Sequence, residues 1–599
     1  MISHRIEIAD VHAHQFRVTL TVPQPAAQQR LSLPAWIPGS YLVREFARHL
    51  SQLQARQGAR EIALQQLDKA TWLAPCDGRG ALTVSYLVYA FDTSVRTAFL
   101  DAQRGFYNGT SVFLRVEGRE AEPQAVEMRG LPKGWRVGTA LPAVKTDARG
   151  QGLYQAADYD ELVDHPVELG DFWRGEFKAA GVPHEFIVAG ALPDFDGERL
   201  LADARRICEA EIAFWHGRRK PHFKRYVFML NAVDDGYGGL EHRASTALIA
   251  ARRDLPQRAR PGARPAADPK SELKTDLSEG YVTLLGLISH EYFHTWNVKR
   301  LRPAEFARYD YTQENYTELL WFFEGFTSYY DDLLLVRAGL IDEPRYLKLL
   351  AKTVTGVLAS PGRQVQSVAQ SSFDAWVKYY RGDENTPNAT ISYYTKGSLV
   401  ALALDLTLRA RGQGSLDDVM RGLWARSDGG PISQDDIAAV LHEVGGRSMA
   451  AELQAWVHGT GELPLKELLQ RAGVNWSQQA PTMAQRLGLR VSESALTGIK
   501  VSHVLRGGAA EAAGLAAGDE LLGVDDWRLR RLDDLLRLLP DDGRATLLVS
   551  RDQRLLHLPL AAAALPESGA VALSPAAPAA EHNKSALAAQ SLRQAWMRG

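Results

Sequence analysis

Cysteine is scarce in this chain of 599 residues, which contains only Cys76 and Cys208. Two cysteines exclude a disulfide framework, although a single bridge stays open, and the simplest interpretation is two buried thiols in a reducing compartment. Long apolar runs are also lacking, because even the stretch Leu319–Val336 is broken by acidic residues. A membrane-spanning helix needs about 18 uninterrupted apolar residues, so none is expected.

A signal peptide of the usual kind is lacking as well, since charges interrupt residues 1–10 before a sufficiently long apolar stretch can form. We therefore expect a soluble, cytoplasmic protein, or a periplasmic one if a leader is missing from the sequence. Neither sign of charge is in excess: 69 Lys and Arg residues face 71 Asp and Glu residues, a formal net charge of −2. This balance gives no indication of nucleic acid or an anionic membrane as the main partner.

What is present is the composition of an ordinary globular protein, with 45% apolar and 23% charged residues. The length is too great for one core and predicts about three to five domains. Residues 1–165 are β-rich, with apolar and polar residues alternating at Arg5–Ile8, His14–Thr21, Leu82–Tyr89 and Ser111–Val116. This pattern predicts an all-β N-terminal domain of the sandwich type.

A second domain is expected over residues 166–475. Its first part alternates strand, helix and strand at Glu185–Ala189, Arg199–Trp215 and Arg225–Leu230, and helical periodicity dominates from about residue 280. The Arg-, Pro- and Ala-rich stretch Arg252–Lys274 predicts an exposed loop. Short strands return over residues 480–561, and residues 562–599 predict a flexible Ala/Pro-rich tail, with a short helix at its end as an option.

The motif His290–His294, of the form His-Glu-x-x-His, lies in an apolar run typical of a buried helix. Positions i and i+4 share one helix face, so both imidazoles can reach one zinc ion. Zinc lowers the pKa of a bound water towards about 7, and Glu291 between the two histidines is placed to take its proton. By contrast, His184-Glu185 lacks the second histidine and falls in a strand pattern, which indicates a structural pair.

A third ligand is expected from Glu324, a single acid in an aromatic, apolar surround. A carboxylate buried there is costly without a cation, which favours Glu324 over the alternative Glu318. Acids behind the ligands usually orient the imidazoles. Asp331 and the pair Trp296-Asn297 are candidates for that role. Each of these residues could equally be an ordinary surface or packing residue.

The run His290–Pro303, followed by Glu324-Gly325-Phe326-Thr327, resembles the gluzincin metallopeptidases, and within them the glycyl-aminopeptidase-like enzymes with a C-terminal PDZ domain. Further segments that carry the resemblance are Trp36–Tyr41, Asp164–Gly170 and Gly238–His242. The resemblance implies a β-rich N-terminal domain and an α+β thermolysin-like zinc peptidase domain with a helical extension.

The resemblance also implies two further site residues. Gly238-Gly239-Leu240-Glu241-His242 stands where related aminopeptidases carry Gly-x-Met-Glu-Asn, whose Glu binds the free α-amine of the substrate. Tyr394 matches the Tyr of a Tyr-x-Lys-Gly motif, and a phenol there can donate to the oxyanion of the tetrahedral intermediate. The departures at Leu240 and His242 leave strict aminopeptidase specificity less certain than zinc hydrolysis.

Near the C-terminus, the stretch Ala513–Val524 resembles a PDZ domain of the bacterial peptidase type. Such domains bind an extended chain end along a sheet edge, and Leu487-Gly488-Leu489 is the candidate turn for holding a carboxylate. Together these features predict a zinc-dependent aminopeptidase that removes N-terminal residues, glycine or other small ones, from peptides. The alternatives are a zinc endopeptidase with PDZ-recruited substrates and a non-catalytic, zinc-stabilised peptide-binding scaffold.

Overall fold

The computed structural model describes residues 1–77, 79–258, 277–562, 569–577 and 583–599. These residues form two compact units. The first unit comprises Met1–Tyr316, Arg337–Ile341 and Ser427–Ile432, and the second comprises Thr317–Val336, Asp342–Arg426 and Ser433–Gly599. Most of the predicted loop Arg252–Lys274 lies outside the described residues. The predicted domain boundaries at 165, 475 and 561 stay predictions.

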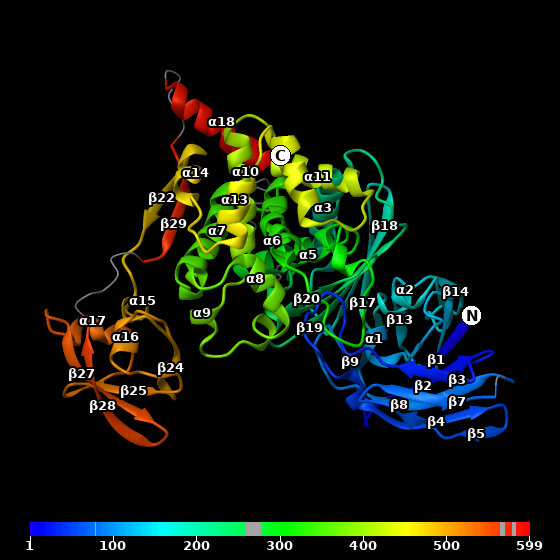
Figure 1. Ribbon diagram of the computed structural model, residues 1–599. Helices are drawn as coiled ribbons and strands as arrows, with labels where there is room; N and C mark the ends of the chain where they lie inside the picture. The colour runs from blue at the N-terminus through cyan, green and yellow to red at the C-terminus, as the bar shows by residue number, and fades with distance from the viewer. Residues whose placement is uncertain (78, 259–276, 563–568, 578–582) are drawn as a thin grey trace. The chain divides into compact units, whose positions relative to one another are not determined.

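The first unit begins with an all-β region, which confirms this part of the predicted fold class (Figure 1). Its largest sheet has eight strands in the order β14-β15-β12-β1-β2-β8-β4-β5. The alternation of apolar and polar residues along a strand determines which face of the sheet is buried. In β2 the fully buried residues are Phe16, Val18, Leu20 and Val22. The strands are β1 (Ile2–Asp10), β2 (Gln15–Val22), β4 (Leu50–Gln57), β5 (Arg60–Ile62), β8 (Leu82–Tyr89), β12 (Gln124–Arg129), β14 (Ala143–Thr146) and β15 (Gly152–Ala156).

Two four-stranded sheets, β13-β16-β10-β9 and β11-β3-β7-β6, complete this region. The strand predicted over Ser111–Val116 is only partly present. A short helix, α1 (Gly109–Val112), takes its first half because the Ser111 hydroxyl and main-chain amide both bond to the Asn108 carbonyl. The strands are β3 (Gln28–Ser32), β6 (Gln65–Gln66), β7 (Thr71–Pro75), β9 (Ala98–Leu100), β10 (Arg104–Tyr107), β11 (Arg115–Val116), β13 (Arg136–Gly138) and β16 (Val167–Gly170).

The remainder of the first unit is an α+β layer built on the sheet β17-β18-β19-β21-β20. Strands β18, β19 and β21 are parallel, whereas β20 pairs with β21 antiparallel at the end of the sheet. Helix α5 packs against both α3 and β20. The strand, helix and strand predicted between residues 185 and 230 are confirmed. The elements are β17 (Trp173–Ala179), β18 (Val182–Ala189), α3 (Gly197–His216), β19 (Tyr226–Val233), β20 (Tyr237–Glu241), β21 (Ser245–Ala251) and α5 (Glu279–Phe293).

The second unit is mainly helical, as the periodicity from residue 280 predicts. Helices α6 and α10 cross closely at a pair of glycines: a Cβ atom on Gly325 would lie 2.6 Å from the Cα atom of Gly397. Both sequence motifs therefore need their glycine, which directly follows Glu324 in one and comes three residues after Tyr394 in the other. The main helices are α6 (Leu320–Arg337), α7 (Glu343–Leu358), α8 (Val368–Phe373), α9 (Thr386–Ala389), α10 (Thr395–Ala410), α11 (Leu416–Ser427), α12 (Gln434–Gly445), α13 (Ala450–Leu453) and α14 (Leu465–Arg471).

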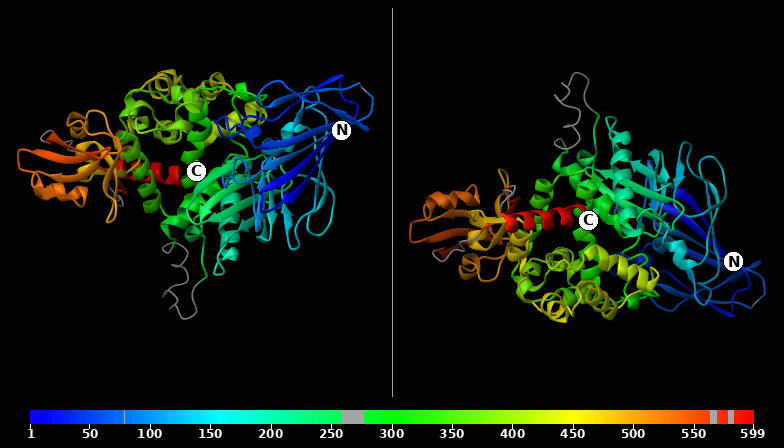
Figure 2. Two further views of the ribbon diagram at one scale, coloured as in Figure 1. Left: turned by 90° about the horizontal axis from the view of Figure 1, so that it is seen from below. Right: turned by 90° about the horizontal axis from the view of Figure 1, so that it is seen from above.

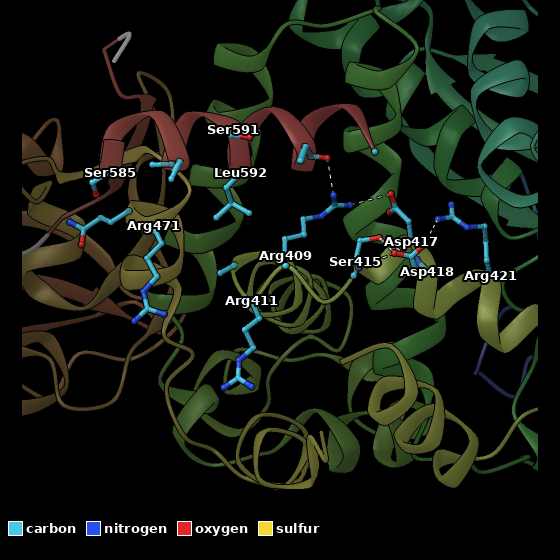
Figure 3. Close-up of a pocket in the computed structure, with 18 residues that line it drawn as sticks. Arg409, Arg411, Ser415, Asp417, Asp418, Arg421, Arg471, Ser585, Ser591 and Leu592 are labelled. Carbon is cyan, nitrogen blue, oxygen red and sulfur yellow. Dashed lines mark hydrogen bonds and ion pairs between the residues drawn. The ribbon is translucent and has the colours of Figure 1, made fainter. Parts of the chain in front are cut away.

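The stretch expected to be a flexible tail is anchored in its described parts. Strand β29 (Val571–Pro575) pairs with β22 (Val474–Gln478), and helix α18 (Lys584–Arg598) packs against α10 and α14 (Figures 1 and 2). The side chain of Trp596 is fully buried, and its indole N–H donates to the Tyr329 hydroxyl at 2.9 Å. Figure 3 shows Arg409 held between Asp417 and the main chain of α18. Composition alone missed these contacts.

The PDZ region of the second unit is a β module with its own apolar core, which includes Leu487, Ile499, Val524 and Leu547. Its sheet runs β23-β24-β25-β27-β28, with β26 paired to β25. The elements are α15 (Met483–Leu487), β23 (Leu489–Ser494), β24 (Gly498–Val504), α16 (Ala509–Ala512), β25 (Glu520–Val524), β26 (Trp527–Arg528), α17 (Leu535–Leu538), β27 (Arg544–Arg551) and β28 (Arg554–Ala561).

Cys76 and Cys208 are both buried free thiols, as the simplest interpretation of the sequence predicts. Among the helices of the described ranges, none combines the length and the apolar character needed to cross a membrane.

Candidate active site

Helix α5 carries the His-Glu-x-x-His motif. Ser278 caps the N-terminus by accepting the Tyr281 main-chain N–H, and the helix ends at Phe293, so that His294 stands at the C-cap. The Nε2 atoms of His290 and His294 lie 3.1 Å apart. Two nitrogens bound to one tetrahedral zinc at the usual distances are separated by about 3.4 Å, so the helix already presents both rings at ligand spacing.

The ring of His294 is oriented from behind. Its Nδ1 atom lies 2.7 Å from the Asn297 main-chain carbonyl, which makes Nδ1 the N–H donor and leaves the lone pair of Nε2 for a metal. Asn297, one of the candidates for this role, thus acts through its backbone. The Trp296 side chain instead donates to His216 at 2.7 Å.

Glu324 carries the third candidate ligand atom of the predicted set. One ligand atom from each of His290, His294 and Glu324 lies within 4.8 Å of the others. Glu324 is 2% exposed, whereas the alternative Glu318 is exposed. Two imidazole nitrogens and one buried carboxylate are the donor set of many catalytic zinc sites, which keep a fourth position open. The residues present therefore fit a zinc ion.

Glu291 packs against strand β20. A Cβ atom on Gly239 would lie 2.1 Å from the Glu291 carboxylate oxygen Oε1, so only glycine leaves room for this side chain. Glu291 is 5% exposed, and helix α5 presents it to the strand from the turn between the two histidines. The close contact explains Gly239 of the motif: at this residue the strand approaches the helix more closely than any side chain would allow.

Glu241 stands at the end of β20, with its carboxylate against the Trp36–Tyr41 loop. A Cβ atom on Gly39 would lie 2.4 Å from the Glu241 oxygen Oε1, and Gly39 has a φ of +95° that favours glycine. Glu241 is 4% exposed, and within the described residues Oε1 has no hydrogen-bond partner. A buried carboxylate oxygen in this condition is a site for a cation or a hydrogen-bond donor.

A buried ion cluster fixes the turn that follows Glu241. Asp164 accepts from the Arg243 main chain at 3.0 Å, lies 3.2 Å from the His242 Nδ1 atom, and pairs with Lys299 at 2.7 Å. Burial works against the ionised carboxylate, but Lys299, His242 and Arg243 together hold the pKa of Asp164 well below its usual range. The cluster ties the Asp164–Gly170 segment, the β20–β21 turn and the loop after α5 to one another.

Tyr394 lies at the N-terminus of α10 in a group of four tyrosines. Its ring stacks on Tyr379 and Tyr393, and its hydroxyl is 3.5 Å from that of Tyr380. Burial, followed by the charge of Glu324, raises the pKa of Tyr394 well above its usual value. The phenol is therefore protonated at neutral pH and able to donate. Tyr393, the neighbour with which it could be confused, is fully buried.

Sequence reasoning singled out the residues of the two helical motifs but gave no role to Gly39, which packs against Glu241, or to Asp164, which fixes the turn after it. The segments Trp36–Tyr41 and Asp164–Gly170 carried the family resemblance. The resemblance indicated that these segments contribute to function, but it did not indicate which contacts they make. Their contacts join residues far apart in the chain and are set by packing.

Comparison with known families matches three parts of the chain. The Peptidase M61 N-terminal domain matches residues 3–171, the M61 glycyl aminopeptidase matches residues 283–400, and the PDZ domain matches residues 477–535. No curated protein matches the chain.

A solved structure gives a close match over the whole chain. The chain is 35% identical to an aminopeptidase N family protein from Idiomarina loihiensis, with 100% of both chains covered and a TM-score of 0.90. It is 15% identical to a mutant M1 zinc metallopeptidase from Deinococcus radiodurans bound to a Tyr-Ser-Ala substrate. That match covers 77% of this chain and 94% of the other, with a TM-score of 0.45.

Proposed function

Because this chain belongs to the M61 glycyl aminopeptidase family of metallopeptidases, we propose that it is a zinc-dependent aminopeptidase that releases single N-terminal residues, glycine or other small ones, from peptides. One observation carries the proposal. Among the residues that the structure describes, one oxygen of the buried Glu241 carboxylate at the end of β20 has no hydrogen-bond partner, and Gly239 of that strand packs against Glu291.

The metal is proposed to be zinc, held by His290, His294 and Glu324. The 3.1 Å spacing of the imidazole nitrogens and the burial of the carboxylate support this assignment. When bound, zinc supplies a Lewis acid that polarises the scissile carbonyl and makes water acidic enough to lose a proton near neutral pH.

Glu291 is the proposed general base. Its carboxylate takes a proton from the attacking water and then delivers that proton to the nitrogen of the leaving amine. The contact with Gly239 supports this role, because it restricts the carboxylate to the side of helix α5 that faces the edge strand. A peptide laid along β20 would then bring its scissile bond to the same place.

Glu241 is proposed to bind the α-ammonium group of the substrate through its unpartnered oxygen, a charge-assisted hydrogen bond that fixes the cleavage position one residue from the N-terminus. Gly238 and Gly239 support the substrate backbone. Tyr394 is proposed to donate its hydroxyl proton in a hydrogen bond to the oxyanion, and its raised pKa keeps that proton in place.

The PDZ module is proposed to bind the C-terminus of a peptide. Strand β23 is at the end of its sheet and pairs with β24 alone among the described strands, which leaves an edge for an added strand. Gly488, between α15 and β23, has a φ of +71°, and the Leu487-Gly488-Leu489 turn that it forms is the proposed place for the carboxylate.

A peptide panel with free and acetylated N-termini tests the proposal, using the purified protein as isolated, after chelation and after zinc return. We expect zinc-restored release of single residues from free amines only, since acetylation removes the charge that Glu241 binds. Zinc-dependent internal cleavage of both forms would overturn the aminopeptidase in favour of an endopeptidase. Zinc binding without cleavage of any peptide would favour the non-catalytic scaffold.

A further inference from the structure

Arg96 reaches the edge strand of the catalytic sheet from the all-β region. It lies in the segment before β9, and its Nη2 atom donates to the main-chain carbonyl of Gly239 at 3.2 Å. A Cβ atom on Gly238 would lie 3.8 Å from its Nη1 atom. The guanidinium group is therefore beside Gly238 and Gly239, two to three residues along β20 from Glu241.

The charge of Arg96 is not neutralised. Within the described residues no carboxylate lies within ion-pair distance of its guanidinium, and its Nε atom is buried without a hydrogen-bond partner. Arg104, from the neighbouring strand β10, shows the usual arrangement: it forms two hydrogen bonds to Glu168, at 2.9 and 2.8 Å. A half-buried guanidinium whose only acceptor among the described residues is one main-chain carbonyl can take an anion.

The direction of β20 places Arg96 on the side of the strand where a peptide would lie. The His242 main-chain N–H donates to the Ser245 carbonyl, so this pair is hydrogen-bonded in the antiparallel ladder. Hydrogen-bonded pairs alternate along such a ladder. Glu241 and Gly239 therefore direct their N–H and C=O groups away from β21, and the Gly239 carbonyl that Arg96 contacts belongs to this outer edge.

We infer that Arg96 binds the C-terminal carboxylate of a short peptide whose α-amine is bound by Glu241, so that the preferred substrates are peptides of two or three residues with a free C-terminus. The inference rests on the proposed aminopeptidase function. An opposite charge then stands at each end of the outer edge of β20, and Arg96 acts as a specificity-determining residue.

The spacing suits this length of substrate. Strand residues rise by about 3.4 Å each, so the three steps from Glu241 to Gly238 cover roughly 10 Å. An extended tripeptide spans a similar distance from its amine to its carboxylate, and the long arginine side chain brings a dipeptide within reach. The planar guanidinium can grip a carboxylate with two parallel hydrogen bonds, which a neutral amide end cannot accept.

The test compares Gly-Ala and Gly-Ala-Ala, each with a free C-terminus and as the C-terminal amide, together with glycine anilide. Wild-type enzyme is expected to favour the free acids by about 10- to 100-fold in kcat/KM, the size of a hydrogen bond to a charged group. In Arg96→Gln this ratio falls towards one while the rates on the amides and the anilide stay within about threefold of wild type. Arg96→Lys keeps an intermediate ratio, and Arg17→Gln, on the exposed face of β2, keeps the full ratio.

Equal use of acids and amides by wild-type enzyme would overturn the inference. So would an Arg96→Gln variant that loses acids and amides to the same extent, since that is the behaviour of a structural tie to Gly239, or an acid preference confined to peptides of about five residues or more. Release of glycine from the anilide reports the aminopeptidase itself. Its absence would overturn the proposed function and this inference with it, whereas its presence with no acid preference overturns the inference alone.

Discussion

The first unit contains two His-Glu pairs that the structure treats in opposite ways. His184-Glu185 lies on strand β18, where consecutive side chains point to opposite faces of the sheet. His290-Glu291 lies on helix α5, where the next turn brings a second histidine to the same face. The same dipeptide becomes a structural pair in the strand and a candidate catalytic pair in the helix.

The partners of the two pairs explain the difference. His184 is 1% exposed and bonds through its ring nitrogens to the Val182 carbonyl and the Tyr292 hydroxyl. Glu185 is buried between the guanidinium groups of Arg174 and Arg225. Both members of the strand pair thus have their hydrogen-bond and ion-pair partners within the protein. Glu291 instead faces a glycine on an edge strand, so a buried acid is kept next to a place where a substrate can lie.

The largest expected effect separates the two glutamates in catalysis. Glu291→Gln should lower kcat by about 10²- to 10⁴-fold, the usual contribution of a positioned base, while zinc content stays at the wild-type level. The matched variant Glu185→Gln should keep kcat at a temperature where it is folded. The measurement is steady-state release of N-terminal glycine, with zinc counted by atomic absorption. Equal loss in both variants would remove the distinction between the pairs.

The second effect separates the histidines in metal binding. His294→Gln should weaken zinc by more than about 100-fold, beyond the loss seen when a residue behind a ligand is changed. Glu324→Gln should act in the same direction, because the amide keeps the shape but removes the charge. His184→Gln should leave the zinc affinity unchanged. Competition with a chromogenic chelator measures all three, and full zinc affinity in His294→Gln would contradict the assigned ligands.

The third effect concerns folding. Glu185→Gln should lower the free energy of unfolding by about 1–3 kcal/mol, because it leaves two arginines without their carboxylate and both are partly exposed to water. Glu176, opposite Glu185 in the ladder and exposed, is the control, and Glu176→Gln should change stability by less than about 0.5 kcal/mol. Urea unfolding of the three proteins measures the difference. Equal stability of Glu185→Gln and wild type would show that water replaces the lost carboxylate.

The smallest effect is a pH dependence of the strand pair. Burial lowers the pKa of His184 to about 4. The unfolded chain then takes up a proton near its ordinary pKa of about 6.5 while the folded chain does not, so stability is lost as pH falls through that range. His184 alone should contribute about 1 kcal/mol of this loss between about pH 7 and pH 5.5. His184→Gln should flatten the slope by that amount, whereas His12→Gln, at an exposed position, should leave it unchanged.

The sequence predicted what depends on local period and residue type. The spacing of His290 and His294 needs only a helix to become ligand geometry, and an acid in an aromatic surround, Glu324, is informative without any tertiary knowledge. The strands of the all-β region and the helix α3 followed from the same periodicities. These are local properties, and the described residues confirm the helices and strands.

The parts that the sequence did not predict depend on packing between distant residues. The Gly39 contact with Glu241 and the ion pair of Asp164 with Lys299 join segments more than one hundred residues apart. The alternating pattern at Ser111–Val116 gave way to a hydrogen-bonded turn at Asn108. The alanine and proline content from residue 562 predicted flexibility. Composition does not show that the indole N–H of Trp596 has a buried hydrogen-bond acceptor, the Tyr329 hydroxyl.

Helix α18 has a consequence for the synthesis of the protein. The hydrogen bond between Trp596 and Tyr329 joins residues 267 positions apart, and α6, which carries Tyr329, also carries Glu324. At roughly 5–20 residues per second, a ribosome needs about 13–53 s to reach Trp596 after it has made Tyr329. For that interval the buried polar groups around Tyr329 lack one of their final partners. A nascent chain therefore passes through a stage, tens of seconds long, in which the helix that bears the proposed third ligand has been synthesised but its hydrogen bond to α18 has not yet formed.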